Sequence, residues 1–356
     1  MSDAAFSGKK VRAIDVKAPK TISQLLKEMS QTGFQGKKLA ETVDVLEKMV
    51  KERGVTILLG YAGSLSTTGQ WKIINWLIEN KYIDILVSTG ANISEDIIEA
   101  MGFSYWQGSH LADDRKLLKE SFNRYYDVFG KEEDYIKMTE MIADFYVSSL
   151  KENHPYSSRE ILYSFGKWLL KNRIDSIVAT AAKHEIPIFC PAIVDSPYGD
   201  AGLIAKSRGF NLMIDNMKDY VEFMHLAENV KETGVIYIGG GVPKDFIQLF
   251  AVTSNLLYSD RKVPGREIKV WASRKGNLLE TYYPHKYAIQ ITTDSPQWGG
   301  LSGCTFEEAV SWGKENPDGE LVQCYCDATI ALPIIAHALA ERLKNFRRKG
   351  TVFTFS

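Results

Sequence analysis

A single lysine, Lys314, closes the run Glu307 to Lys314 (EEAVSWGK), directly after an indole and a glycine. A lysine amine becomes a nucleophile when it loses its proton near neutral pH, and desolvation against an apolar wall lowers the pKa of an amine. Trp312, two positions earlier, offers such a wall. The segment therefore predicts that Lys314 is a covalent nucleophile.

The composition of the 356-residue chain is that of an ordinary globular protein, with 45% hydrophobic and 11% aromatic residues. Its 43 Lys and Arg nearly cancel its 44 Asp and Glu, so no overall field favours nucleic acid or an anionic membrane surface as a partner. The basic run Arg342 to Lys349 is the one local exception. We interpret it as the solvated end of a helix, followed by a C-terminal tail over residues 346–356.

The cysteines and histidines predict neither a disulfide framework nor a metal site. The four cysteines include no C-x-x-C pair, and the six histidines are scattered without metal-ligand spacing. Cys324 and Cys326 alternate along a predicted strand, so they should share one face as small buried hydrophobic residues. Residues 1–20 are polar and contain no apolar signal region. We expect a flexible N-terminal segment and a cytoplasmic protein.

Short apolar runs alternate with segments of helical period along most of the chain. This alternation predicts an α/β fold with a doubly wound, mainly parallel, Rossmann-like sheet whose strands are buried on both faces. We expect one domain over residues 21–345, with an additional, mainly helical region over 111–172. The predicted strands are Val55–Leu59, Ile83–Ser88, Ile186–Cys190, Leu212–Asp215, Val235–Ile238, Tyr287–Thr292 and Val322–Cys326, and the predicted helices include Gln70–Glu79, Glu95–Met101, Arg159–Lys171 and Pro333–Lys344.

In a doubly wound sheet the ligand binds beyond the carboxyl ends of the strands. The run Ile238 to Gly241 (IGGG) ends one predicted strand, and Pro243 suits the first turn of a following helix. Successive glycines let backbone amides approach a phosphate, and a helix N-terminus favours anions, so the run predicts a pyrophosphate cradle. It matches neither G-x-G-x-x-G nor a P-loop, and a tight turn remains the alternative. Asp245 likewise has an alternative role as an acid in the first turn of the helix.

A second group of candidate residues is acidic. Asp195 and Asp200 flank one loop, and together with Glu308 and Glu95 they could meet cationic amines. Loop aspartates also form Asx turns or helix caps, and Glu308 follows Thr305 at the spacing of a capping box, so each acid keeps a structural alternative. Their occurrence together with a candidate amine nucleophile favours the functional interpretation.

Four segments together resemble the deoxyhypusine synthase family. They are the run Glu307 to Lys314 with its S-W-G-K end, the glycine run Ile238 to Lys244, the loop Pro191 to Asp200, and the segment Tyr325 to Thr329. The resemblance extends from about Gly54 to Arg342, and the S-W-G-K segment in its acidic context is highly specific.

The resemblance implies an NAD-dependent aminobutyl transferase, built as a homotetramer with active sites shared between paired subunits. In such an enzyme NAD takes hydride from a polyamine carbon, the enzyme lysine captures the imine, and the aminobutyl group passes to an acceptor amine before the hydride returns. Lys314 would be the nucleophile, Trp312 the wall over the methylenes, and Asp200, Glu308 and Glu95 the partners of the polyamine ammonium groups. The positions that match the family's NAD site are Gly63, Ser64, Thr89, Gly90, Asp195, Gly240, Gly241, Thr293, Asp294, Ser302 and Asp327.

Several residues depart from the family's pattern. Asp245 stands where these enzymes carry a histidine, Leu249 replaces an asparagine, Leu301 replaces a polyamine-binding aspartate, and Gly63-Ser64 replaces a serine-asparagine pair. Residues 258–284 form an insertion. Because losing a buried carboxylate weakens the binding of a charged ligand unless another acid replaces it, Asp245 is the candidate substrate-binding replacement.

These changes favour spermidine or putrescine as the donor and a small amine as the acceptor, as in homospermidine formation. Transfer to a lysine of a translation factor is the alternative, and it would make a protein a partner. A plain NAD dehydrogenase would not need Lys314, and a protein that only binds NAD or polyamine would show no turnover. Acids beside Lys314 would keep its amine protonated, so we expect them at the far ends of the bound polyamine.

Overall fold

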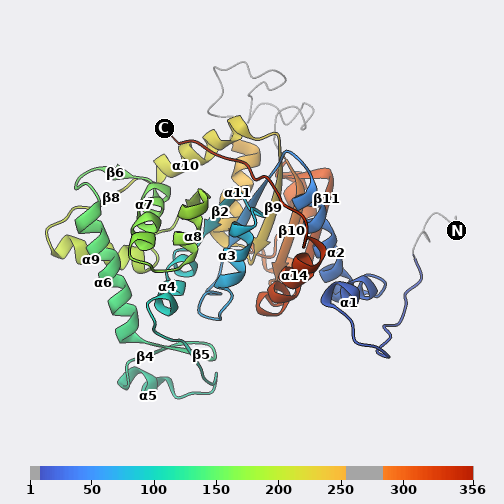
Figure 1. The fold of residues 1–356 in the computed structure, drawn as a ribbon, viewed down its shortest axis with the longest axis horizontal. Coiled ribbons are helices and arrows are strands. Elements are labelled where there is room, and N and C mark those ends of the chain that lie inside the picture. Colours follow the sequence, from blue (N-terminus) through green and yellow to red (C-terminus); the bar gives the residue numbers. More distant parts are fainter. Residues whose placement is uncertain (1–8, 254–283, 356) are drawn as a thin grey trace.

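The computed structural model describes residues 9–253 and 284–355, so the predicted insertion lies outside the described residues apart from Pro284. At the centre is a six-stranded sheet in the order β11-β10-β9-β1-β2-β7, in which every pairing is parallel (Figure 1). The prediction of a doubly wound, mainly parallel α/β fold is confirmed. The strands of this sheet are β1 (Val55–Tyr61), β2 (Ile85–Ser88), β7 (Ile188–Phe189), β9 (Glu232–Ile238), β10 (His285–Thr292) and β11 (Glu315–Tyr325).

Helices cover both faces of this sheet (Figure 1). Along β1, Ile57 and Leu59 belong to the hydrophobic core that includes α2, α3 and α14, whereas Leu58 belongs to the core that includes α10 and α11. Two apolar faces explain why the sequence shows continuous apolar runs instead of alternation. The helices are α1 (Ile22–Met29), α2 (Phe34–Lys51), α3 (Trp71–Glu79), α4 (Glu95–Ala100), α5 (Asp114–Lys119), α6 (Glu132–Ser149), α7 (Ser158–Lys171), α8 (Ile177–His184), α9 (Pro197–Ser207), α10 (Asn216–His225), α11 (Gly241–Thr253), α13 (Phe306–Ser311) and α14 (Ala328–Arg342).

Two predicted elements differ from the structure. The predicted strand Leu212–Asp215 exists as β8 (Met213–Ile214), but it pairs with β6 (Pro155–Tyr156) in a two-stranded sheet outside the central one. Helix α14 starts well before Pro333, because Asp327 caps its N-terminus by accepting a hydrogen bond from the backbone N–H of Thr329 at 2.8 Å. Short apolar runs of this kind do not reveal which sheet they join, since pairing is decided by tertiary contacts.

The region 111–172 contains α5, α6 and α7 together with short strands. β4 (Phe122–Tyr125) and β5 (Val128–Lys131) form an antiparallel pair, and β5 also pairs with β3 (Trp106–Gln107). In Figure 1 this small sheet and α5 project away from the central sheet. The domain boundaries given above remain predictions.

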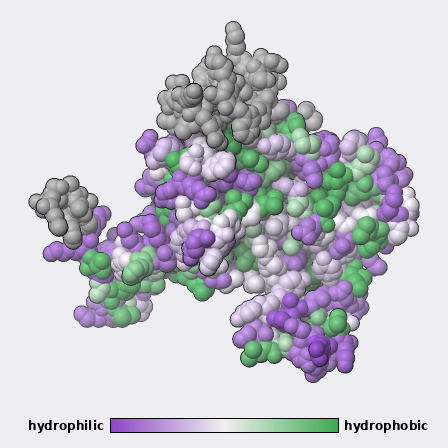
Figure 2. Space-filling view, turned by 180° about the vertical axis from the view of Figure 1, so that it is seen from behind, coloured by the Kyte–Doolittle hydropathy of each residue, from purple (hydrophilic) through white to green (hydrophobic). Residues whose placement is uncertain are grey.

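The surface carries hydrophobic side chains among hydrophilic ones. Figure 2 shows this mixture on one face of the molecule, without a continuous apolar belt. Within the residues that the structure describes, no helix has the length and apolar character needed to cross a membrane. Scattered exposed apolar residues of this kind are usual on globular proteins.

The C-terminal segment packs against the amino ends of β1 and β2. The Arg348 guanidinium pairs with the Asp84 carboxylate, with Nη2 and Oδ2 2.7 Å apart and the two side chains 5% and 0% exposed. Asp84 also accepts hydrogen bonds from the backbone N–H of Ile57 at 2.7 Å and of Thr351 at 2.8 Å, and Phe353 is buried. The interpretation of the basic run as a solvated helix end is therefore wrong for Arg348, because the buried carboxylate of Asp84 requires a cation.

Replacing Arg348 with alanine would leave Asp84 buried without its cation. We expect the free energy of unfolding to fall by about 3–5 kcal/mol, the usual cost of removing one partner of a buried pair, as measured by equilibrium urea unfolding. Arg347→Ala is the matched control, because Arg347 is exposed and donates to the carbonyl oxygen of Phe346. It should change stability by less than about 0.5 kcal/mol. An equal, small loss in both variants would contradict the assignment.

Candidate active site

The carboxyl ends of β1, β9, β10 and β11 surround a cavity of about 370 Å³. The predicted cofactor residues that line this cavity are Gly63, Gly240, Gly241, Thr293, Asp294, Ser302 and Asp327. Thr89 is joined to this set, because its Oγ1 donates to the carbonyl oxygen of Gly63 at 3.3 Å, and Ser64 and Gly90 are the chain neighbours of Gly63 and Thr89. The last of them, Asp195, follows β7 at the same edge of the sheet.

The glycines at this edge leave room for backbone to approach a ligand. A Cβ on Gly240 would lie 2.4 Å from Ser302 Cα, so only glycine fits there. Gly241 has φ +57° with open space where a Cβ would stand, and it is the first residue of α11. A helix N-terminus beside exposed backbone amides fits the pyrophosphate of a dinucleotide. Cofactor binding by these residues remains a prediction.

The chain delivers Lys314 through a short helix and a glycine turn. Thr305 Oγ1 caps α13 by accepting the backbone N–H of Glu308 at 3.1 Å. Gly313 then turns the chain with φ +76°, and the carbonyl oxygen of Lys314 accepts the backbone N–H of His285 at 3.0 Å, at the start of β10 and β11. The backbone of the predicted nucleophile is thus fixed by two elements of regular structure.

The Lys314 amine lies between an acid, an amide and an indole. Its Nζ is 3.2 Å from Asp245 Oδ1 and 3.4 Å from Gln248 Oε1, both on α11. The same Nζ lies 5.6 Å from the centre of the Trp312 ring, close enough for a cation–π contact. The lysine side chain is 13% exposed, and the indole is 56% exposed. Trp312 therefore borders an amine whose side chain is largely buried, while the tryptophan itself stays exposed in a single chain.

Asp245 lies in a different place from the one expected for it. We expected acids at the far ends of a bound polyamine, but the Asp245 carboxylate contacts the Lys314 amine directly. It follows Lys244 at the start of α11, which packs along the face of the sheet where Lys314 emerges. The expectation failed because it treated the lysine alone, without the helix that runs beside it.

Glu308 is exposed. Its backbone N–H donates to Thr305 Oγ1, so Thr305 caps the helix, as the structural alternative for this spacing requires.

Directly behind Lys314 is a carboxyl group that the sequence analysis missed. Glu315 is fully buried, and its Oε1 accepts hydrogen bonds from Gln248 Nε2 and from the Tyr237 hydroxyl, both at 3.4 Å. Its Oε2 has no partner. Burial raises the pKa of Glu315 to about 8, against the opposing effect of these hydrogen bonds and of Lys244 and Lys314. The available signal was only a charged residue immediately after Lys314, followed by the polar run Asn316 to Glu320.

A second missed residue, Lys244, connects the glycine cradle to the loop before α13. Its buried Nζ donates to Gln290 Oε1 at 3.0 Å and to the carbonyl oxygens of Leu301 at 3.2 Å and Cys304 at 2.8 Å. Gln290 Nε2 in turn donates to the carbonyl oxygens of Gly239 at 2.8 Å and Ser302 at 2.9 Å. Burial lowers the pKa of Lys244. The loop that carries Ser302 and Leu301 is therefore fixed to the cradle by buried hydrogen bonds.

Two predicted substrate-binding acids form a separate group after β2 and β7. Glu95 is 4% exposed, and its Oε2 accepts the Ser64 hydroxyl at 2.6 Å. Burial raises the pKa of Glu95 to about 7. Asp200 is exposed and accepts the Tyr135 hydroxyl at 3.4 Å. Four inter-strand steps, roughly 19 Å, separate β2 from β11. Within the described residues neither acid forms a hydrogen bond or ion pair with Lys314, whose amine contacts Asp245 and Gln248 instead.

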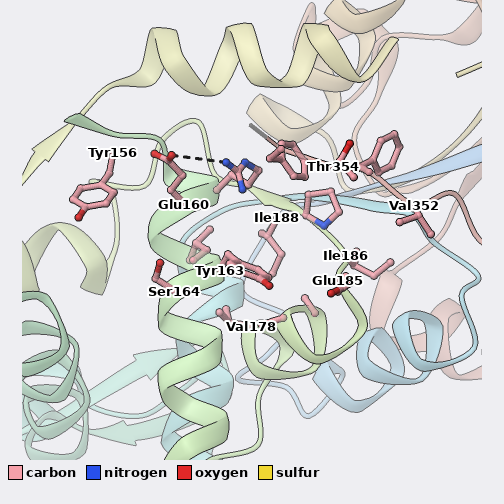
Figure 3. Close-up of a pocket in the computed structure, with 17 residues that line it drawn as sticks. Tyr156, Glu160, Tyr163, Ser164, Val178, Glu185, Ile186, Ile188, Val352 and Thr354 are labelled. Carbon is pink, nitrogen blue, oxygen red and sulfur yellow. Dashed lines mark ion pairs between the residues drawn. The ribbon is translucent and has the colours of Figure 1, made fainter. Parts of the chain in front are cut away.

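A larger cavity, of about 530 Å³, lies away from all of these residues (Figure 3). It is bounded by α7, α8, the start of β7 and the C-terminal residues 352–355. Its walls are mostly apolar, with Glu160 and Glu185 among the few charged residues, and none of the predicted site residues lines it. The cavity at the carboxyl edge is the one that predicted cofactor residues line.

Comparison with known proteins supports the resemblance along the whole chain. The family model described as deoxyhypusine synthase matches residues 24–339. The chain belongs to the deoxyhypusine synthase family. It is 44% identical to "Probable deoxyhypusine synthase 2" of Methanosarcina mazei over 100% of this chain and 96% of that protein, and 45% identical to the protein of the same name from Archaeoglobus fulgidus over 87% and 95%.

Among solved structures, a deoxyhypusine synthase from Entamoeba histolytica matches with a TM-score of 0.62 and 18% identity, covering 95% of this chain and 99% of that one. At this identity the structural match supports the fold. Membership of the deoxyhypusine synthase family makes the chain a transferase of that type.

Glu95 provides a test of amine binding by this family member. A carboxyl group with a pKa of about 7 is half protonated at pH 7, and an ammonium bound beside it would favour the charged form. We expect spermidine binding to the NAD-loaded protein at pH 7 to release roughly half a proton, measured by calorimetry in buffers of different ionisation enthalpy. Glu95→Gln should abolish that release, and the exposed Glu79→Gln should not. Unchanged release in Glu95→Gln would exclude Glu95 as an ammonium partner.

Proposed function

We propose that the protein transfers a 4-aminobutyl group from a polyamine, spermidine or putrescine, to an acceptor amine through an imine on Lys314, with NAD as the cofactor. The observation that carries the proposal is the Lys314 amine held between Asp245, Gln248 and Trp312 on one side of the glycine cradle's helix. An amine in this setting has acceptors for its N–H groups and an apolar neighbour that limits solvent.

NAD, when bound, would accept a hydride from the donor's carbon and later return it. The protein's own residues do the rest. Lys314 attacks the donor imine carbon, the original C–N bond breaks, and the departing amine leaves with the proton that Lys314 gives up. Asp245, in contact with the Lys314 amine, is placed to hold that proton during the exchange. The acceptor amine then displaces Lys314 in the same way, and the returned hydride reduces the new imine.

We further propose that the complete site needs a second copy of the chain in a homotetramer. The separation between Lys314 and the group of Glu95 and Asp200 supports this, because a polyamine recognised at both ends would have to contact both groups. Exposed apolar residues also occur close to the site in sequence, with Val242 50%, Trp298 74% and Trp312 56% exposed. Such residues are common where a surface is covered by a partner.

For the acceptor we favour a small amine, as in homospermidine formation. Leu301 supplies no carboxylate where the family binds its polyamine, whereas Asp245 adds one next to the nucleophile, so the charges that position the substrates have changed. The relatives in Methanosarcina mazei and Archaeoglobus fulgidus support divergence, because each organism also has a "Probable deoxyhypusine synthase 1", 35% and 37% identical to this chain. The alternative acceptor is a lysine of a translation factor.

Borohydride trapping tests the covalent step. Incubation with NAD and spermidine followed by borohydride should add an aminobutyl group to Lys314, located by peptide mass mapping, because borohydride reduces the imine to a stable amine. Lys314→Ala should lose the adduct and lower turnover by at least about 10³-fold. Lys171→Ala, which removes an exposed lysine at the end of α7, should keep both.

Product analysis with putrescine and with a lysine-bearing translation factor then separates the acceptors. Transfer to putrescine alone supports the small-amine choice, and transfer to the protein alone overturns it. Hydride transfer that persists in Lys314→Ala would indicate a dehydrogenase, while binding of NAD and polyamine with neither adduct nor product would indicate a non-catalytic binding protein.

A further inference from the structure

A buried carboxyl lies behind the Lys314 amine, and the proposed function does not use it. The Glu315 side chain points into the sheet interior, where it contacts Gln248, and Gln248 contacts Lys314. Gln248 is itself fully buried, so its amide has no solvent to turn toward. The chain of contacts is Lys314 Nζ to Gln248 Oε1 at 3.4 Å, then Gln248 Nε2 to Glu315 Oε1 at 3.4 Å.

The orientation of the Gln248 amide matters for the nucleophile. An amide has one oxygen that accepts and one NH₂ that donates. With Nε2 engaged by Glu315, the oxygen faces Lys314, whereas a reversed amide would present N–H to an amine that is itself a donor. A neutral primary amine has two N–H groups, and Asp245 and Gln248 supply one acceptor for each, which leaves the nitrogen lone pair free to attack.

We infer that Glu315 is a positioning residue for Lys314: acting through Gln248, it holds the amine for attack, and its carboxylate charge raises the pH at which that amine loses its proton. The inference rests on the proposed function of Lys314. An ionised carboxylate behind the amine favours the ammonium form, while a neutral carboxyl does not. The Lys314 ammonium therefore favours loss of the Glu315 proton, and the Glu315 carboxylate opposes loss of the Lys314 proton.

Charged and titratable groups face Glu315 and Lys314 from each element that packs on them. Lys244 and Asp245 belong to α11, Tyr237 to β9, and Cys304 and Glu308 lie on the α13 side, where they interact with Lys244 or with each other. On β10, His285 is the strand partner of Glu315. Its Nδ1 bonds Thr233 Oγ1 at 2.7 Å, and burial lowers its pKa to about 3, so it is neutral here.

Burial places the pKa of Glu315 at about 8, so rising pH removes its proton before an ordinary lysine loses its own. Above that pH the wild-type amine faces a buried anion in addition to Asp245. In Glu315→Gln the anion never forms. The Lys314 amine of the variant should therefore become neutral at a lower pH than in the wild type.

The test measures the amine without requiring turnover. Trace labelling with acetic anhydride, followed by peptide mass spectrometry, gives the pH midpoint at which Lys314 becomes reactive. In Glu315→Gln we expect the midpoint to fall by about one pH unit. Glu307→Gln, an exposed acid on the same segment, should leave it within about 0.2 unit of the wild type.

A second variant guards against misfolding of Glu315→Gln. Tyr237→Phe removes one donor to the Glu315 carboxylate, so Glu315 keeps its proton to higher pH and Lys314 should be labelled faster than in the wild type at pH 8. Thermal unfolding and NAD binding report any general damage to either variant. If Glu315→Gln leaves the midpoint unchanged and Tyr237→Phe leaves the labelling rate at pH 8 unchanged, the inference is wrong. If no borohydride adduct forms but the midpoint moves as expected, the proposed function fails while the coupling of Glu315 to Lys314 stands.

Discussion

The buried ammonium of Lys244 is the interaction on which the geometry of the site depends. Its three donors meet three acceptors, two of them backbone carbonyls of the loop before α13, so its hydrogen bonds are satisfied without a carboxylate. That loop carries Ser302 against the glycine cradle, and it leads into the helix that delivers Lys314. Loss of this ammonium would leave buried carbonyls without partners, which costs more than the hydrogen bonds contribute when present. The position of the cavity at the carboxyl edge and that of Lys314 are thereby linked.

The charges around Lys314 are arranged by depth. Asp245 is 42% exposed, so solvent screens it and its carboxylate remains available to compensate a positive charge. Glu315 is fully buried and keeps a proton to about pH 8. A buried anion at Glu315, in addition to Asp245, would oppose formation of the neutral amine. Burial of Glu315 favours its protonated form and so weakens that opposition. Two acids can lie near this lysine because burial raises the pKa of Glu315 and so reduces the negative charge that it directs at the amine at neutral pH.

The sequence predicted the central sheet well and the contacts between its loops poorly. Apolar runs such as Val55–Leu59 identify buried strands because both faces of a parallel sheet exclude water, and β1 follows that run closely. The same kind of signal at Leu212–Asp215 led to a strand in a different sheet, since strand pairing depends on contacts distant in the chain. The run of glycines marked the cradle for a local reason, because Gly240 and Gly241 meet steric requirements that few other residues satisfy.

Prediction of the site reached the residues with a local signature and missed those with a spatial one. Lys314 and Trp312 were predicted because their order in the chain is informative, and the structure places the indole beside the amine. Lys244 and Glu315 were not, because a charged residue beside an apolar run reads as exposed until its buried partners are known. Likewise Asp245 was assigned to the substrate, although α11 places it against the nucleophile.

The division of the candidate site into two groups has a physical origin in the sheet order. Glu95 and Asp200 follow β2 and β7, whereas Lys314 precedes β11 at the other end of the strand order, and among the described residues Lys314 bonds Asp245 and Gln248 and neither of these two acids. A flexible cationic substrate gains most of its binding free energy from acids at both ends, because charge-assisted hydrogen bonds are the strong ones available to it. A second copy that places its Glu95 and Asp200 across from Lys314 would meet that requirement without any change in the fold. It would also cover Trp312, whose exposed indole would then exclude water from the amine, and the reactivity of Lys314 would be tied to assembly.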